Sequence, residues 1–142
     1  MRYLITFALL LILAAPAMAQ ETYILIVNES VDVSKLSKKE LKKIYRGKMK
    51  MWSKDLDIRP CYANVNTKTG KVFFKKLLKI SPAKFKKYWL RMVFSGSGAA
   101  PVSLGNVESI IDFVSKNPGG MGIIPASYKD KLKGVRIVGL SG

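Results

Sequence analysis

The stretch Leu36–Trp52, LSKKELKKIYRGKMKMW, specifies one helix and both of its ends. Ser37 and Glu40 have the spacing of a capping box, in which each side chain accepts a hydrogen bond from the other residue's backbone amide. Gly47 predicts the end of the helix, because glycine adopts the left-handed conformation at little cost. The stretch therefore predicts a helix over residues 38–46. Its buried stripe comes from four apolar residues at helical spacing, namely Leu36, Leu41, Ile44 and Tyr45.

The rest of the chain alternates short apolar runs with helix signals. Strands are expected at residues 23–28, 58–63, 121–125 and 135–140. Further helices are expected at residues 71–80, from 82 onward with Phe85, Trp89, Met92 and Val93 as the buried face, and at 107–116. Ser81-Pro82 and Asn106 are typical of helix starts. The alternation predicts an α/β fold with a mainly parallel sheet flanked by helices.

Three motifs, taken in order, resemble the phosphate-type periplasmic solute-binding proteins. The stretch Leu36–Trp52 is similar to that family's pattern L-S-x-x-E-L-x-x-I-F-x-G-x-x-x-x-W. Residues 85–98, which run into Pro101, and Asn117–Ile123, which is similar to P-G-A-I-G-Y, follow in the family's order. The resemblance covers nearly the whole chain after its start. It is to a short, stand-alone branch labelled phosphate ABC transporter substrate-binding protein.

This resemblance implies the fold, the ligand and the partner. The fold would be a single periplasmic-binding-protein-like lobe of type 2, the ligand phosphate or another small oxyanion, and the partner an ABC transporter permease or another envelope protein. Ile123 stands where the family has an aromatic residue, so a tyrosine contact at the ligand cleft is not implied.

The chain begins like a secretory signal. Arg2 precedes an apolar run from Leu4 to Ala15, and Ala17-Met18-Ala19 is a small-x-small cleavage site. The run is too short for an ordinary membrane span. We therefore expect a signal peptide over residues 1–19, cleaved after Ala19, a domain over residues 20–142, and a periplasmic protein that is not integral to the membrane. An uncleaved anchor is the alternative.

The chain is strongly basic, with 25 Lys plus Arg against 9 Asp plus Glu and a formal charge of +16. Such a field attracts polyanions, although lysine-rich helix faces also occur simply as solvated surface. The lysines are not interleaved with exposed aromatic residues or arginines, so only non-specific attraction to nucleic acid is expected. Cys61 lies in an expected strand and is interpreted as a small buried hydrophobe, with pairing between chains as the alternative.

Catalytic chemistry finds little support in the sequence. The chain has no histidine, which removes the commonest general base and metal ligand. Asp55 and Asp57 lie in a polar connection, where paired carboxylates are usually solvated, and the remaining acidic residues lack metal-site spacing. We therefore expect no catalytic residues, no metal and no cofactor, and a binding protein rather than an enzyme.

The best candidate for chemistry is an anion site where a polar turn meets a helix. It consists of Asn66, Thr67, Thr69, Gly70 and Lys71. Amides at a helix start carry partial positive charge, and hydroxyl and lysine groups add donors, which together suit phosphate or sulfate. The family resemblance places an S-G-T motif here, with Lys68 in place of its glycine. The alternative is that Thr and Asn only cap the helix.

Ser95, Gly96 and Ser97 form a second candidate, because consecutive amides of a glycine-rich turn can hold an anion. A helix C-cap followed by a connector is the alternative. At the level of function, three hypotheses remain: an oxyanion-binding protein linked to transport, a ligand-free interaction or sensor module of the cell envelope, and a non-specific polyanion binder.

Overall fold

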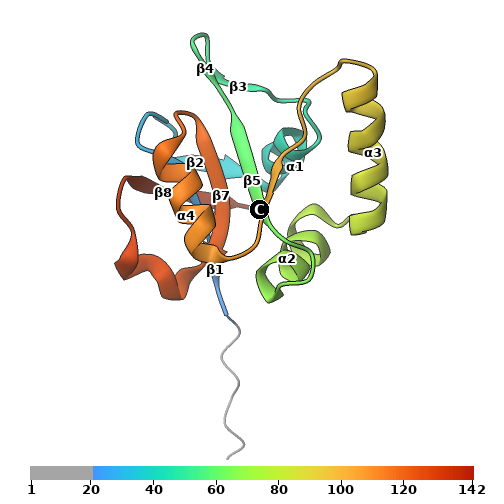
Figure 1. Ribbon diagram of the computed structural model, residues 1–142. Coiled ribbons are helices and arrows are strands. Elements are labelled where there is room, and N and C mark those ends of the chain that lie inside the picture. Colours follow the sequence, from blue (N-terminus) through green and yellow to red (C-terminus); the bar gives the residue numbers. More distant parts are fainter. Residues whose placement is uncertain (1–20) are drawn as a thin grey trace, which may run out of the picture.

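The computed structural model describes residues 21–142, and it shows one central sheet with helices on both faces (Figure 1). The predicted signal peptide lies outside these residues. The strands are β1 (Tyr23–Asn28), β2 (Lys35–Ser37), β3 (Met51–Ser53), β4 (Leu56–Asp57), β5 (Arg59–Ala63), β6 (Val102–Leu104), β7 (Gly120–Pro125) and β8 (Val135–Ser141). The helices are α1 (Lys38–Tyr45), α2 (Lys68–Val72), the π-helix η1 (Phe73–Leu78), α3 (Pro82–Phe94), α4 (Val107–Lys116) and the 3-10 helix η2 (Ala126–Lys131).

Six of these strands form the central sheet, in the order β2-β8-β1-β7-β5-β6, while β3 and β4 pair separately. The pairings β2 with β8, β5 with β7 and β5 with β6 are parallel. Strand β1 runs antiparallel to both of its neighbours, β7 and β8. The predicted α/β fold with a mainly parallel sheet is therefore confirmed, with β1 as the one reversed strand of this sheet.

Helix α1 has the predicted capping box. The Glu40 amide donates to Ser37 Oγ at 3.1 Å, and the Ser37 amide donates to Glu40 Oε2 at 2.8 Å. The helix ends at Tyr45, and Gly47 is left-handed with φ of 68°. A side chain at Gly47 would also lie 2.7 Å from the Trp89 ring, so both backbone conformation and packing require glycine there.

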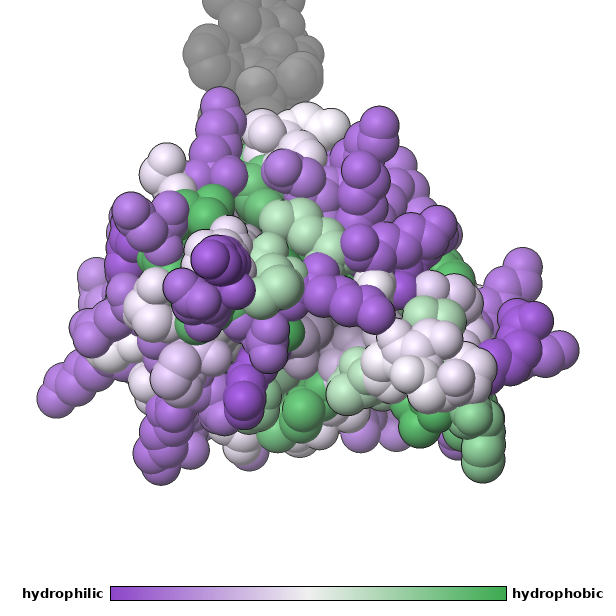
Figure 2. Space-filling model, turned by 90° about the horizontal axis from the view of Figure 1, so that it is seen from above, coloured by the Kyte–Doolittle hydropathy of each residue, from purple (hydrophilic) through white to green (hydrophobic). Residues whose placement is uncertain are grey.

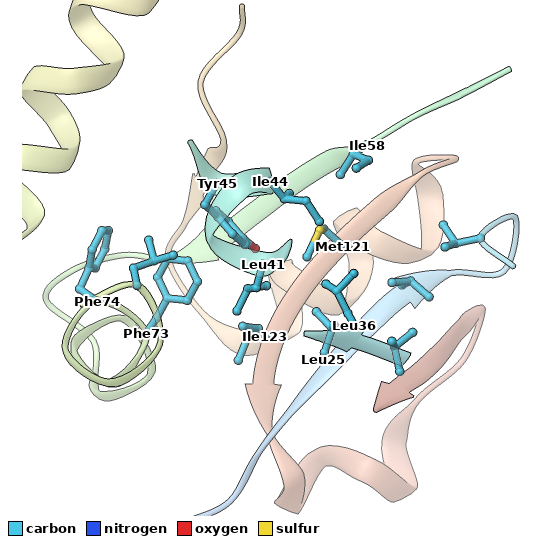
Figure 3. Packing of buried hydrophobic residues seen from close by; sticks show 14 of the residues in the cluster. Leu25, Leu36, Leu41, Ile44, Tyr45, Ile58, Phe73, Phe74, Met121 and Ile123 are labelled. Atoms are coloured by element: carbon cyan, nitrogen blue, oxygen red, sulfur yellow. The ribbon is translucent and has the colours of Figure 1, made fainter. Parts of the chain in front are cut away.

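The sheet separates two hydrophobic cores because side chains of β1 alternate between its faces. Leu25 and Val27 enter the larger core with α1, η1 and α3, whereas Ile26 enters the smaller core under α4. Figure 3 shows the larger core, in which Phe73 and Tyr45 meet between η1 and α1. Their ring centroids lie 4.7 Å apart in an edge-to-face arrangement, which stabilises the contact beyond its buried area.

Hydrogen bonds join the family motifs through this core. Trp89 Nε1 donates to the Tyr45 carbonyl at 2.9 Å, and Trp52 Nε1 donates to the Gly119 carbonyl at 2.9 Å. Tyr45 Oη donates to the Cys61 carbonyl at 2.6 Å. These bonds link α3 to α1, β3 to the residue before β7, and α1 to β5. Cys61 is fully buried and makes no disulfide, as the sequence predicted for a small buried hydrophobe.

Two sequence predictions need correction. The helix expected over residues 71–80 begins at Lys68, because Thr67 caps it, and it widens into a π-helix from Phe73. Val93 was expected on the buried face of α3, yet it is 49% exposed. The sequence also gave no signal for the short strands β2, β3, β4 and β6, which have two or three residues each.

Exposed basic residues make much of the surface hydrophilic and positively charged. Figure 2 looks from above Figure 1 and shows a mainly hydrophilic face, with smaller hydrophobic areas between the long polar side chains. The described lysines are mostly exposed, and the chain's formal charge is +16. Like-charge repulsion across this surface opposes compaction and self-association.

Candidate anion-binding site

The first candidate segment lies at the end of the sheet where the parallel strands β5 and β7 finish. Strand β5 finishes at Ala63, and a turn then leads directly into α2 (bottom of Figure 1). The backbone amide of Asn64 donates to the Leu104 carbonyl at 2.8 Å, which ties the turn to the end of β6. Strand β1 begins at the same end, since Tyr23 lies opposite Pro125 at the end of β7. Groups far apart in the sequence therefore meet here.

The turn is built around Asn64 and Thr67. Asn64 Oδ1 accepts from the Asn66 amide at 3.0 Å, and the Asn64 carbonyl accepts from the Thr67 hydroxyl at 2.6 Å. Thr67 Oγ1 in turn accepts from the Gly70 amide at 3.0 Å, which makes it the N-cap of α2. Both hydrogen-bonding functions of the Thr67 hydroxyl are thus engaged within the turn, as the capping alternative predicts.

Glycine is required at position 70 because two backbone carbonyls approach it closely. A Cβ atom at this position would lie 2.0 Å from the Asn64 carbonyl oxygen and 2.6 Å from that of Ala63. Only a residue without a side chain lets the first turn of α2 fold back onto the end of β5. The turn and the helix start are therefore one rigid unit.

Two helix-start amides in this unit have no hydrogen-bond acceptor within residues 21–142. The first amides of a helix have no intrahelical acceptor, and here those of Gly70 and Lys71 bond to Thr67, to its hydroxyl and its carbonyl respectively. The amides of Lys68 and Thr69 precede them and carry the partial positive charge of a helix N-terminus. An anion at this place would receive two N–H donors from the backbone.

Side chains at and just before the start of β1 complete the surroundings of this helix start. Lys68 Nζ lies 3.2 Å from Glu21 Oε2, in an ion pair whose lysine is largely exposed. Burial raises the pKa of Tyr23, and the nearby Glu21 carboxylate raises it further. The Tyr23 hydroxyl is buried near the Thr69 side chain, and Thr69 is itself only 7% exposed. A neutral phenol and a buried threonine therefore stand beside the free amides.

The structure brings Asn66, Thr67, Thr69, Gly70 and Lys71 together in one turn, as the sequence predicted for neighbours in the chain. Sequence reasoning missed Glu21 and Tyr23, because they are more than forty residues away in the chain and read only as the start of a strand. One signal could have indicated Tyr23, namely its place at the first position of a central strand. In the sheet, this position lies at the end where β5 leads into α2.

The second candidate segment lies at the opposite end of the sheet, in the loop after α3 (Figure 1). Its amides close the helix: those of Ser95, Gly96 and Ser97 donate to the carbonyls of Arg91, Val93 and Met92 at 3.0, 3.1 and 2.9 Å. Gly96 is left-handed with φ of 71°, and the Ser97 carbonyl accepts from Lys50 Nζ at 2.7 Å. This geometry is a helix C-cap, and the segment shares no site with Asn66–Lys71.

The family model described as a PBP superfamily domain matches residues 15–141 of this chain. The chain belongs to the PBP superfamily. The family is in general one of substrate-binding proteins rather than enzymes, and the resemblance drawn from the sequence motifs is confirmed. A search of curated proteins found no match.

Solved structures of phosphate-type binding proteins share the fold of this PBP superfamily domain. PstS from Borrelia burgdorferi aligns with a TM-score of 0.68 and 17% identity over 86% of this chain and 48% of its own. An ABC-type phosphate transport receptor from Vibrio cholerae gives 0.64 and 17% over 84% and 46%. A Clostridium perfringens protein solved with bound phosphate gives 0.67 and 19% over 84% and 45%. The chain thus spans about half the length of these proteins.

Residues 21–142 show neither a cluster of metal-ligating side chains nor a helix suited to span a membrane. No group of three or more His, Cys, Asp or Glu side chains within this part of the chain is arranged to hold a metal ion. Within the same residues, no helix is both long and apolar enough to cross a membrane.

Proposed function

We propose that this PBP superfamily domain binds phosphate or a related small oxyanion at the start of α2. The observation that carries the proposal is the rigid turn Asn64–Gly70, which leaves the amides of Lys68 and Thr69 free at the positive end of the helix. Tyr23 adds a neutral hydroxyl, and Lys68 and Lys71 add charge, so the site would hold an anion by electrostatics and hydrogen bonds. Ser95–Ser97 remains a separate and weaker candidate, since its amides cap α3.

The comparison proteins support the choice of ligand and suggest its context. The titles of the similar structures name phosphate transport and bound phosphate, so we infer a link to ABC-type transport and a permease as partner. We further propose export to the periplasm, with the signal peptide removed after Ala19.

Calorimetric titration of the purified protein with phosphate tests the proposal. We expect saturable binding that Lys68→Glu weakens about tenfold or more, because a carboxylate at the helix start repels the anion and competes for its amides. Lys76→Glu is the matched control, since it makes the same charge change on an exposed residue of η1 and should leave binding within about threefold. Absence of saturable heat at millimolar phosphate in the unaltered protein would rule out small-anion binding.

The second candidate function is a ligand-free interaction or sensor module of the cell envelope. It is favoured by one observation, namely that the Thr67 hydroxyl is fully engaged in capping α2 rather than free for a ligand. Affinity capture from envelope extract separates the two functions. A partner that is retained equally with and without phosphate, together with a flat phosphate titration, would favour the module.

A further inference from the structure

A groove of about 480 Å³ lies between helix α3 and the edge strand β6. Leu90 and Val93 of α3 line one side of the groove. The other side is lined by Ala100, which precedes β6, and by Ser103, which lies in β6. Aromatic side chains complete the lining, namely those of Tyr62, Phe74, Phe85 and Trp89. The volume and the apolar lining are within the range of known ligand sites.

Strand β6 offers unpaired backbone groups toward this groove. It is the last strand in the sheet order, and among the described strands it pairs only with β5. The Leu104 carbonyl accepts from the Asn64 amide, so Leu104 directs its backbone groups toward β5. Successive residues of a strand direct them to alternate sides, which leaves the N–H and C=O of Ser103 facing outward. An exposed edge of this kind is a template for another strand.

The facing side of α3 is apolar although it is exposed. Leu90 is 50% exposed and Val93 is 49% exposed, and both line the groove. Phe94, the last residue of the helix, is 88% exposed. Apolar side chains gathered beside an open strand edge mark an interaction surface, because a partner can cover the apolar side chains and pair with the strand's backbone groups.

The charges around the groove define what could occupy it. Lys86 lines the groove, and an adjoining hollow that shares Val65, Phe74 and Pro82 with it is lined by Lys71, Lys75 and Lys79. Neither lining includes an aspartate or a glutamate. A second copy of this chain, itself carrying +16, would meet like charge here. Charge complementarity therefore favours an acidic occupant.

We propose that an extended segment of an acidic partner protein adds to β6 as a further strand, between β6 and α3. Its backbone pairs with the outward groups of Ser103, and its alternate apolar side chains enter the groove against Trp89 and Phe85. Carboxylates at its ends meet Lys86 and the lysines of the adjoining hollow. Main-chain hydrogen bonds provide affinity in this mode, and the groove and the lysines provide selectivity.

Binding of the fluorescently labelled peptide Glu-Glu-Val-Thr-Val-Thr-Val-Glu-Glu, followed by anisotropy, tests the proposal. Saturable binding is expected. The same peptide with lysine in place of glutamate, and one with methylated backbone nitrogens at its centre, should each bind at least about tenfold more weakly, because they lose charge complementarity and backbone donors respectively.

Variants of the protein locate the binding. Ser103→Pro removes the outward N–H and should weaken binding about tenfold, whereas Ser103→Val retains that donor and should not. Proline is tolerated on an edge strand where the N–H faces solvent, so the fold should survive, which circular dichroism checks. Lys86→Gln should weaken binding a few fold, while Lys87→Gln, an equal charge change outside the groove lining, should leave it unchanged.

Four results would overturn the proposal. Equal affinity for the acidic and basic peptides would show non-specific adhesion, and equal affinity of Ser103→Pro and the unaltered protein would exclude pairing with β6. If no peptide bound while phosphatidylglycerol vesicles did, and Leu90→Glu abolished that binding, the surface would be a lipid contact. Self-association lost in Leu90→Glu would assign the groove to a second copy of the chain. None of these results bears on phosphate binding at α2.

Discussion

At the scale of single residues, Gly70 is the position where the site and the fold depend on each other most directly. A methyl group there would overlap the Asn64 carbonyl and crowd that of Ala63, so the backbone would have to shift. We expect Gly70→Ala to lower the free energy of unfolding by about 2 kcal/mol or more. Gly105→Ala is the control, since no atom lies within 4 Å of its added Cβ. Urea unfolding of both variants checks the difference, and equal midpoints would contradict it.

Two buried acids at the centre of the molecule make its stability depend on alkaline pH. Burial raises the pKa of Cys61 to about 12 and raises the pKa of Tyr45 well above its usual range. An unfolded thiol loses its proton near pH 8.5, so the folded state holds the proton more tightly. Stability from Cys61 is thus full below about pH 8.5 and is lost as the pH rises toward 12, at about 1.4 kcal/mol per pH unit.

Urea unfolding at pH 8 and pH 10 measures this loss. We expect the unaltered protein to lose about 2 kcal/mol over that interval, mainly through Cys61, since tyrosine ionisation in the unfolded chain begins to contribute near pH 10. Cys61→Ala should start from a lower stability, because it leaves a small cavity, and should then change much less between the two pH values. The same loss in both proteins would show that Cys61 is not its source.

At the scale of elements, the capping box sets the stability of α1. Ser37→Ala removes the acceptor for the Glu40 amide and should lower the free energy of unfolding by about 1 kcal/mol. Glu40→Gln should have a smaller effect, because glutamine can also accept from the Ser37 amide. The midpoints of thermal unfolding should rank the two variants in that order. A larger effect of Glu40→Gln would mean that the carboxylate's charge, rather than the box, stabilises the helix.

The elements that could be predicted from sequence are those whose ends are determined by local chemistry. Ser37, Ser81 and Asn106 cap their helices as predicted, because a side-chain oxygen meets an amide only three residues away. Strand β6 could not be predicted, since three residues show no periodicity and their pairing depends on β5, some forty residues earlier. Val93 fits helical spacing, yet spacing does not say whether a partner covers that face.

The candidate site divides in the same way. The turn around Thr67 follows from neighbouring residues, and the sequence identified it. Glu21 and Tyr23 reach Lys68 and Thr69 only because β1 runs antiparallel to β7 and so begins where β5 ends. Whether the Ser95–Ser97 amides were free could not be read from a glycine-rich loop either, because their acceptors are the last carbonyls of α3.

At the scale of the whole molecule, the charge of +16 and the proposed anion site both respond to added salt, but in different ways. Screening of like charges should raise the midpoint of thermal unfolding with either sodium chloride or sodium phosphate. Phosphate bound to the folded state adds a saturable term of RT ln(1 + [L]/Kd), about 2.7 kcal/mol at one hundred times Kd. Comparing the two salts at equal ionic strength therefore separates the general effect of charge screening from the binding of phosphate at the site.

The variants Lys68→Glu and Lys76→Glu distinguish charge screening from phosphate binding, because both lower the net charge by the same amount. Both variants should gain less from sodium chloride than the unaltered protein, since there is less repulsion left to screen. Lys68→Glu alone should lose the extra, saturable gain from phosphate, because only that change places a carboxylate beside the free amides at the start of α2. A phosphate gain that persists in Lys68→Glu would arise from exclusion of the salt from the surface or from another site, and the anion would not be held at α2.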